Sequence, residues 1–390
     1  MGCYIASTDN RIYAALEPSY CTAGTASAAN RIPAVKLNLS QTVERPRRQD
    51  KTGSRTFGGW PIGLRRRTTF DVTTYMAGWE PGTDAPCYGD LFRGALGRAG
   101  VVFNGGTAAA GSTAEQVTTA AAHGLVVGQA VRFLGELRFV AAIVSDTAVI
   151  LNAPFSTTPA AGASFGKTIT YLPSSTIPSI SLFDYWTPAA AVQRIAVGAA
   201  VDRMRVRVNG DFHQFQFTGD AAALIDSRTF EDGQAGLTSF PDEPTVSGTN
   251  FSLVAGSLGQ AWFGATPSQF HTVLSAEVTL ENGLDLRSRE FGELKPRCIV
   301  TGQRTVSLDM EIASDVQEQT LALYEAGATG SPISAMLQLG NSDLHLCGIY
   351  MPAVVPEPVD FVDDGARLQW RFRNSRAQGV HNDEISVAFG

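Results

Sequence analysis

The chain has 390 residues, and 30 Lys and Arg against 37 Asp and Glu give a formal net charge of −7 at pH 7. This length predicts two or three domains, each large enough to bury its own core. The sequence has no apolar run that could form a membrane-spanning helix, and residues 1–20 lack the basic start and apolar run of a secretory signal. We therefore expect a soluble protein that is intracellular when made.

Glycine and proline divide the chain into short segments, many of which end at Asn-Gly, Asp-Gly or proline-containing turns. This pattern is typical of a mainly β protein. Two short helices are predicted, over residues 88–97 and 316–327, and each ends at a glycine. The cysteines are odd in number and widely spaced, which argues against a disulfide framework or a zinc site. They are Cys3, Cys21, Cys87, Cys298 and Cys347.

Two pairs of segments are similar to each other without gaps. Residues 209–217 match residues 364–372, and each segment is a turn followed by a strand. Residues 66–72 match residues 304–310, and each is a basic loop end that enters an alternating strand. One fold is therefore expected to occur twice. A duplicated β domain allows three subunits to close a ring of six similar modules.

The two matches are offset by 155 and 238 residues, so the first copy carries an insertion of 83 residues. The insertion starts after Phe103 with a linker of small residues, and its short β-rich runs predict a compact module. The predicted organisation is an N-terminal arm (1–34), a first β domain (35–103 and 188–222), an inserted small β domain (104–187), a linker (223–250) and a second β domain (251–390).

Positive charge is concentrated between residues 41 and 67, which carry a net charge of +6. The basic residues there are Arg45, Arg47, Arg48, Lys51, Arg55, Arg65, Arg66 and Arg67. The equivalent loop of the second copy, residues 281–304, mixes five basic with four acidic residues. The contact candidates in this loop are Arg287, Arg289, Glu290, Lys295 and Arg297.

Three interpretations of the basic loop are possible: binding of nucleic acid phosphates, docking onto an acidic surface of a neighbouring subunit, or a solvated loop without a partner. The mixed charges of the second loop favour docking. Acidic clusters at residues 220–250 and 357–364 are candidate complements.

The sequence shows no catalytic motif. The histidines have no i, i+4 histidine partner of the kind that a helical metal site uses. His213 lies among phenylalanines on a predicted strand and is expected to be structural. We therefore expect neither enzyme activity nor a cofactor or metal, although a Ser/His/Asp triad assembled only in three dimensions stays open.

Several of these segments resemble a known family. Residues 275–287, a strand with an Asn282-Gly283 turn, and the following strand at 302–308 are similar to bacteriophage major tail tube proteins, and residues 12–25 resemble the N-terminal arm of that family. The resemblance covers residues 10–103 and 188–385. The first copy departs from the pattern, because no Asn-Gly follows its strand at 35–39.

The resemblance implies two tandem tail-tube-type β-sandwich or barrel domains, each with a flanking helix, plus the small β insertion domain. It implies trimeric, pseudo-sixfold rings that stack into the tube of a long non-contractile tail, with a long loop reaching the adjacent ring. Double-stranded DNA would pass through without specific binding. Tail terminator, tape measure and distal tail proteins are implied as partners, and the implied location is the virion tail, after synthesis in the host cytoplasm. The family has no catalytic or cofactor-binding residues to transfer.

Two alternatives are kept. The first is a tail terminator, baseplate ring or decoration protein with the same fold. The second is an all-β carbohydrate-binding protein or enzyme, which predicts aromatic and carboxylate side chains converging in a cleft. The five tryptophans have no matched carboxylate pair at any spacing visible in the sequence. The overall charge of −7 also predicts an acidic channel in a ring of three chains, and the insertion is expected on the outside of the ring.

Overall fold

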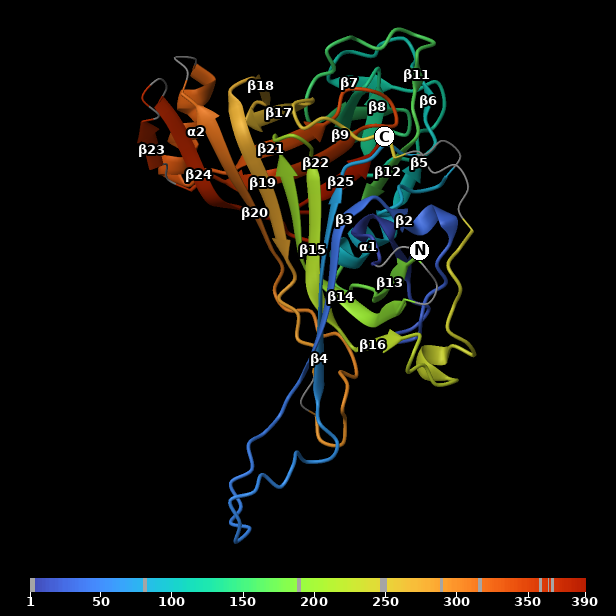
Figure 1. The fold of residues 1–390 in the computed structure, drawn as a ribbon. Helices are drawn as coiled ribbons and strands as arrows, with labels where there is room; N and C mark the ends of the chain where they lie inside the picture. The colour runs from blue at the N-terminus through green and yellow to red at the C-terminus, as the bar shows by residue number, and fades with distance from the viewer. Residues whose placement is uncertain are drawn as a thin grey trace.

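The computed structural model describes residues 4–79, 83–187, 191–245, 251–287, 290–314, 318–357, 360–363, 365 and 368–390. The prediction of a mainly β protein is confirmed: the described residues form twenty-five strands and two α-helices (Figure 1). Short 3-10 helices occur at Ser7–Asp9, Ala28–Asn30 and Gln234–Gly236. No helix in the described part of the chain is both long and apolar enough to cross a membrane.

Eight antiparallel strands form the main sheet, and the long ones lie side by side in Figure 1. In spatial order they are β3 (Ala34–Val43), β4 (Arg66–Tyr75), β15 (Gln214–Ala221), β14 (Arg194–Val208), β19 (Val273–Glu281), β20 (Thr305–Ala313), β24 (Leu368–Ala377) and β23 (Asp360–Asp363).

Alternation along these strands separates a buried face from a polar face. In β20, Val306, Leu308 and Met310 are at most 3% exposed, whereas Ser307 and Asp309 between them point to the other side. Successive side chains of a strand point to opposite faces, so this period of two places one row of apolar side chains in the core. The opposite face of the main sheet is polar, and we call it the polar face.

The two halves of the main sheet have the same strand order, and their registers agree over Met310–Ala313 of β20, whereas for the preceding residues of β20 a β-bulge shifts the partners in β24 by one residue. Val72 of β4 lies opposite Phe217 of β15, and Met310 of β20 lies opposite Phe372 of β24. These residues are related by the offsets of 238 and 155 that the sequence matches gave. The strands β3, β4, β15 and β14 therefore correspond to β19, β20, β24 and β23, and β14 pairs directly with β19.

Two further groups of strands complete the layers around the core. One has the order β5 (Val101–Phe103), β12 (Thr168–Tyr171), β25 (Ser386–Phe389), β22 (Cys347–Val355), β21 (Ile333–Leu339), β17 (Gly259–Gly264) and β18 (Ser268–Phe270). The other has the order β2 (Arg31–Ile32), β1 (Asn10–Leu16), β13 (Ile180–Trp186), the first part of β14, and β16 (Ala223–Asp226). The long strand β14 thus joins this group to the main sheet.

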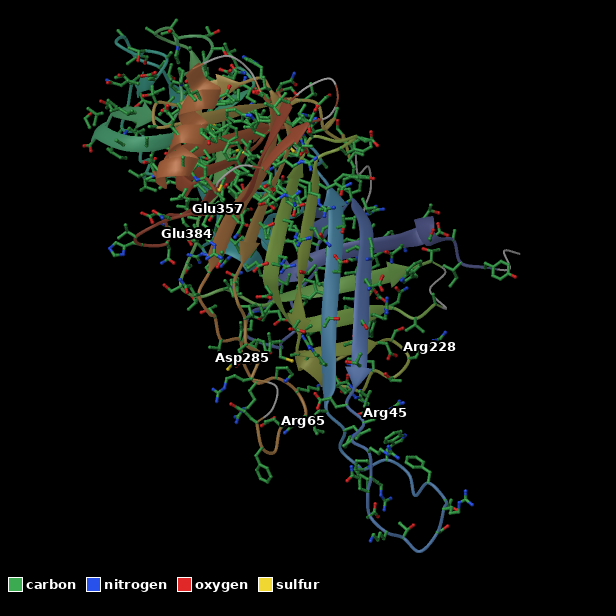
Figure 2. All side chains as sticks on the ribbon, turned by 90° about the vertical axis from the view of Figure 1, so that its left-hand side faces the viewer. Arg45, Arg65, Arg228, Asp285, Glu357 and Glu384 are labelled. Carbon is green, nitrogen blue, oxygen red and sulfur yellow. The ribbon has the colours of Figure 1, made fainter. Side chains whose placement is uncertain are left out.

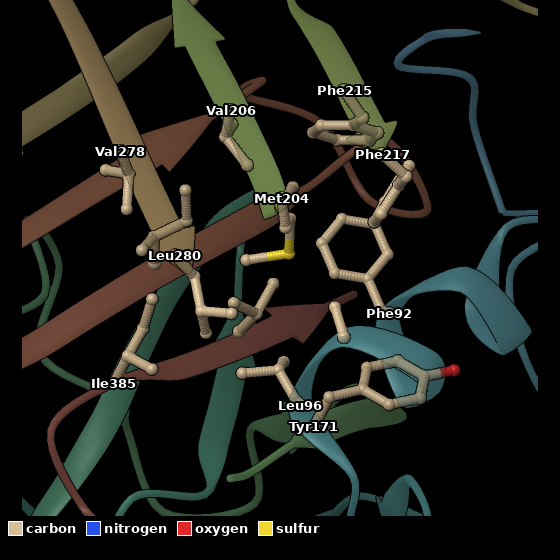
Figure 3. Close-up of a cluster of buried hydrophobic side chains, with 14 of the residues drawn as sticks. Phe92, Leu96, Tyr171, Met204, Val206, Phe215, Phe217, Val278, Leu280 and Ile385 are labelled. Carbon is tan, nitrogen blue, oxygen red and sulfur yellow. The ribbon is translucent and has the colours of Figure 1, made fainter. Parts of the chain in front are cut away.

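Helix α1 (Gly89–Leu96) packs against the buried face of the main sheet. The ring of Phe92 lies 5.2 Å from that of Phe215 and 5.1 Å from those of Phe217 and Phe389, in edge-to-face arrangements (Figure 3). Burying one such side chain contributes about 1.5–3 kcal/mol. The same core contains side chains of both halves, including Met204 and Leu280, so one hydrophobic core spans the repeat.

Both predicted helices are present, with a difference at the end of the second, whose predicted start at residue 316 lies outside the described residues. Helix α1 ends as predicted, because Gly97 has φ +100° and its N–H bonds to the carbonyl of Arg93. Helix α2 (Glu318–Thr329) continues past Gly327, and the left-handed residue that follows its end is Gly330, with φ +68°. Leu323 and Ala326 anchor α2 in the core.

The insertion forms sheets of its own. They are a four-stranded sheet with the order β7 (Gln116–Thr118), β10 (Ala148–Leu151), β9 (Glu136–Ser145) and β8 (Ala130–Phe133), and a pair formed by β6 (Gly106–Thr107) and β11 (Ser164–Phe165). The later strands β12 and β13 belong to the layers of the main body instead.

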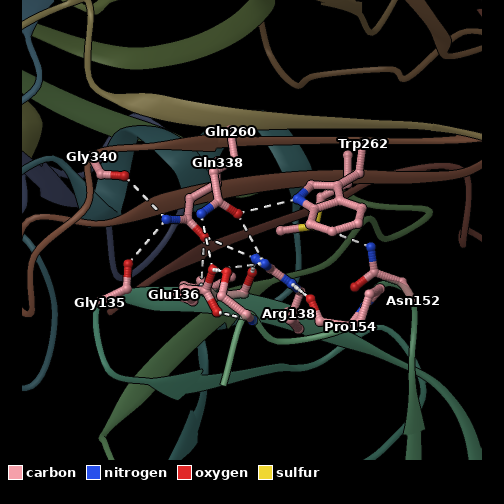
Figure 4. A network of polar contacts seen from close by, with 12 residues as sticks. Gly135, Glu136, Arg138, Asn152, Pro154, Gln260, Trp262, Gln338 and Gly340 are labelled. Atoms are coloured by element: carbon pink, nitrogen blue, oxygen red, sulfur yellow. Dashed lines mark hydrogen bonds and ion pairs between the residues drawn. The ribbon is translucent and has the colours of Figure 1, made fainter. Parts of the chain in front are cut away.

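A buried polar network attaches the insertion to the second half of the chain (Figure 4). The guanidinium of Arg138 is fully buried and donates to Gln338 Oε1 at 3.1 Å and to Gln260 Oε1 at 2.9 Å. It also pairs with Glu136 at 3.2 Å and lies 5.0 Å from the ring of Trp262. Burial lowers the pKa of Arg138 to about 10, and it remains charged at neutral pH. The insertion is therefore packed against the second half of the chain through this buried network.

Candidate assembly interfaces

The two candidate loops leave the same end of the main sheet. Residues 44–65 connect β3 to β4, and residues 282–304 connect β19 to β20 (Figures 1 and 2). The structure therefore brings the basic side chains of the first loop to the same end as Arg287, Glu290, Lys295 and Arg297 of the second. Arg289 lies outside the described residues.

Several of the candidate arginines are engaged within the chain. Arg48 pairs with Asp50 at 2.5 Å and donates to the carbonyl of Gly58 at 2.8 Å, and its hydrogen bond lowers the pKa of Asp50. Arg67 donates to Asp220 at 3.1 Å. Arg45 lies over the ring of Trp60, with 5.8 Å to the centroid. These contacts leave fewer free cations than the sequence suggests.

The second loop has internal pairs too, and it touches the first. Arg287 pairs with Glu290, and Arg297 lies 3.6 Å from Glu293. Arg65 of the first loop donates to the carbonyl of Glu290 at 3.3 Å. The second loop therefore reaches sideways from its own strands to the base of the first loop.

Both loops carry exposed apolar side chains that the sequence analysis did not select. Phe57 is 61% exposed and Ile62 and Phe291 are fully exposed, and Trp60 and Leu294 are each about half exposed. Large apolar groups in a protruding loop could have been recognised in the sequence. Phosphate binding does not need them, whereas a protein interface does.

The main sheet ends in two open edges. Strand β3 pairs along its length with β4, and no other strand in the described residues pairs with it. At the opposite end, β23 pairs only with β24 within the described part of the chain. An unpaired edge presents free N–H and C=O groups that can bind another strand.

The polar face carries charges of both signs in pairs. Across β14 and β19, Arg207 lies 2.7 Å from Glu277, and Arg371 of β24 lies 2.8 Å from Glu311. In the edge strand β3, Lys36 pairs with Asp71 of β4 at 3.0 Å. These three carboxylates of the polar face are thus each matched by a cation.

The acidic clusters are partly used within the chain. Glu243 of the predicted linker accepts hydrogen bonds from Arg11 and Tyr13 of β1. Burial opposes ionisation of Glu243, but these bonds prevail and lower its pKa. The pKa of Tyr13 rises to about 12, because burial and the bond to Glu243 both favour the phenol. Glu243 therefore fastens the linker to the N-terminal strand.

No group of three or more His, Cys, Asp and Glu side chains that could hold a metal ion is found among the described residues. No protein-family model matches the chain, and a comparison with curated proteins returns no match.

Proposed function

We propose that this protein is a structural subunit that assembles through its sheet edges into trimeric, pseudo-sixfold rings, and that these rings stack into the tube of a long non-contractile phage tail. The observation that carries the proposal is the repeated half-sheet, joined internally at β14–β19 and open at β3 and β23. Three copies would repeat the same kind of junction around a closed ring, which leaves no edge exposed.

The polar face is the side of the sheet that would line the channel. The opposite side is covered by α1 and the core. Because Arg207 and Arg371 are already paired with carboxylates, they have less free charge with which to hold phosphates. The proposed channel surface is mixed in charge, and the acidic channel that the net charge of −7 suggested is not part of this proposal.

The two loops supply the proposed contacts between stacked rings. They leave one end of the sheet together, and their exposed apolar side chains, such as Ile62 and Phe291, would be covered by a neighbouring copy. The tail terminator, tape measure and distal tail proteins remain proposed partners by resemblance, as does passage of double-stranded DNA.

Negative-stain electron microscopy of the purified protein over a range of concentrations and salt tests this proposal. We expect rings with threefold symmetry and stacks of such rings. Rings that never stack would favour a terminator or baseplate role, since those proteins occur in few copies. A protein that stays monomeric at all concentrations would contradict the proposal, and sugar binding would then be tested.

A further inference from the structure

Two cavities lie beneath the two halves of the main sheet at corresponding positions. The first has about 510 Å³ and is lined by Arg66, residues 222–226 and Thr229. The second has about 670 Å³ and is lined by Arg304, residues 377–380 and Glu384. The offset of 238 relates Arg66 to Arg304, and the offset of 155 relates residues 222–229 to residues 377–384. The two cavities are therefore equivalent in the repeat.

The first cavity is lined in part by the long loop of the second half. Lys295, from the loop between β19 and β20, lines it together with Glu231 and Gln234. This loop leaves strands next to β14 and passes beneath the first half, where Arg65 donates to the carbonyl of Glu290. The loop between β19 and β20 of the second half thus contacts the first half, whose strand β14 pairs with β19.

The second cavity is lined on one side by Ser174, Ser175 and Ile177, from the segment between β12 and β13, and none of its lining residues comes from the loop of residues 44–65. In the repeat, the strand that corresponds to β19 is β3, and its neighbour on the open side would be β23 of another copy. The loop that corresponds to residues 282–304 is residues 44–65. That loop projects beyond the end of the sheet, away from the rest of the chain (Figures 1 and 2).

We propose that the segment around Phe57, in the loop of residues 44–65, docks in the second cavity of the adjacent copy of this chain in the same ring, whereas the exposed Ile62 of that loop is left for the proposed contact with the next ring. Lys295 lies nine residues before Arg304, and Phe57 lies nine residues before Arg66, so the segment around Phe57 takes the place of Lys295. Phe57 is 61% exposed, and Val380 at the cavity is 80% exposed, so docking would cover both. The inference rests on the ring proposed above.

Cross-linking between two chains that each carry one introduced cysteine tests the docking, and both chains keep the fully buried Cys347. One chain carries Thr56→Cys and the other Val380→Cys, both in a background where Cys3, Cys21, Cys87 and Cys298 are serine, and the mixture is treated with a short bismaleimide. The background protein is first checked for rings by electron microscopy. We expect a cross-linked dimer on a denaturing gel only when both chains are present. As a control within one chain, Lys295→Cys with Gln234→Cys should cross-link without forming a dimer, because both positions line the first cavity.

The outcomes separate the two proposals. Rings that form without a cross-link between the chains overturn the docking and leave the ring proposal standing. A protein that forms no rings overturns both. A second measurement uses Phe57→Ser, which we expect to raise the protein concentration at which rings appear by about tenfold or more, as expected for loss of an apolar anchor. Rings that appear at an unchanged concentration would overturn the role of Phe57.

Discussion

Arg203 of β14 and Glu281 of β19 form an ion pair of 2.5 Å across the boundary between the two halves of the main sheet. Both side chains are about 40% exposed, and an exposed pair of this kind contributes about 0–1 kcal/mol. The backbone ladder and the buried pair of Val206 and Val278 directly opposite each other hold this boundary more strongly. Backbone hydrogen bonds and buried apolar contacts therefore hold this boundary, and the Arg203–Glu281 ion pair adds little to its stability. We call the β14–β19 boundary the seam.

The seam predicts the register of the proposed junction between chains. Arg207 lies opposite Glu277, and in the repeat these positions correspond to Val362 of β23 and Asn38 of β3. Asn38 is the equivalent of Glu277 by register, since it lies opposite Asp71 as Glu277 lies opposite Asp309. Residues directly opposite on antiparallel strands are within disulfide reach. We expect Asn38→Cys mixed with Val362→Cys to give disulfide-linked dimers on a non-reducing gel. Ser40→Cys in place of Asn38→Cys serves as the register control, and cross-linking with equal yield would contradict this register.

Removal of the buried guanidinium should destabilise the whole chain. Arg138→Met leaves Glu136 as an uncompensated, largely buried charge and removes donors from Gln338 and Gln260. Loss of one partner of a buried pair costs about 3–5 kcal/mol. We expect a loss of this size in the free energy of unfolding measured with urea.

Arg48→Met is the matched control for this substitution. Arg48 is also paired with a carboxylate, but its side chain is 39% exposed. We expect little or no change in the free energy of unfolding, because water screens this exposed pair. Equal losses in the two variants would show that the network around Arg138 does not fasten the insertion to the rest of the chain.

His213 should make the fold less stable as the pH falls. Its Nε2 lies 2.9 Å from the carbonyl of Leu258, its Nδ1 has no partner among the described residues, and burial lowers its pKa. The unfolded chain binds this proton near pH 6.5, whereas the folded chain binds it only at lower pH, so stability falls as the pH drops below about 6.5. We expect melting temperatures at pH 5 and pH 7.5 to differ less in His213→Gln than in the parent. An unchanged pH dependence would contradict this role.

Two glycines with similar backbone angles should respond differently to alanine. Gly97 has φ +100°, and a Cβ there would lie 2.4 Å from the carbonyl oxygen of Thr176. Gly111 has φ +92° and open space around it. Alanine at Gly111 should cost about 1–2 kcal/mol from backbone strain alone, and alanine at Gly97 should cost more because of the clash. Urea unfolding of both variants checks this, and a smaller loss at Gly97 would contradict it.

The local elements could be predicted from the sequence because their signals are local. The alternation in β20, the glycine at the end of α1 and the two long basic or mixed loops are all properties of neighbouring residues. The repeat was visible for the same reason, since equivalent strands kept similar patterns at offsets of 155 and 238. The exact end of α2 was not predicted, because the glycine at 327 remains helical and the left-handed turn occurs at Gly330.

Tertiary structure alone decided how these elements meet. The division of β14 between two groups of strands, the contact of Arg138 with Gln338 and the pairing of Glu243 with Arg11 join residues that are distant in the chain. Such contacts depend on the packing of the whole core, and one sequence carries no periodic signal for them. The sequence by itself determined which strands, loops and repeats exist, whereas folding decided which loops share a cavity and which edges stay open.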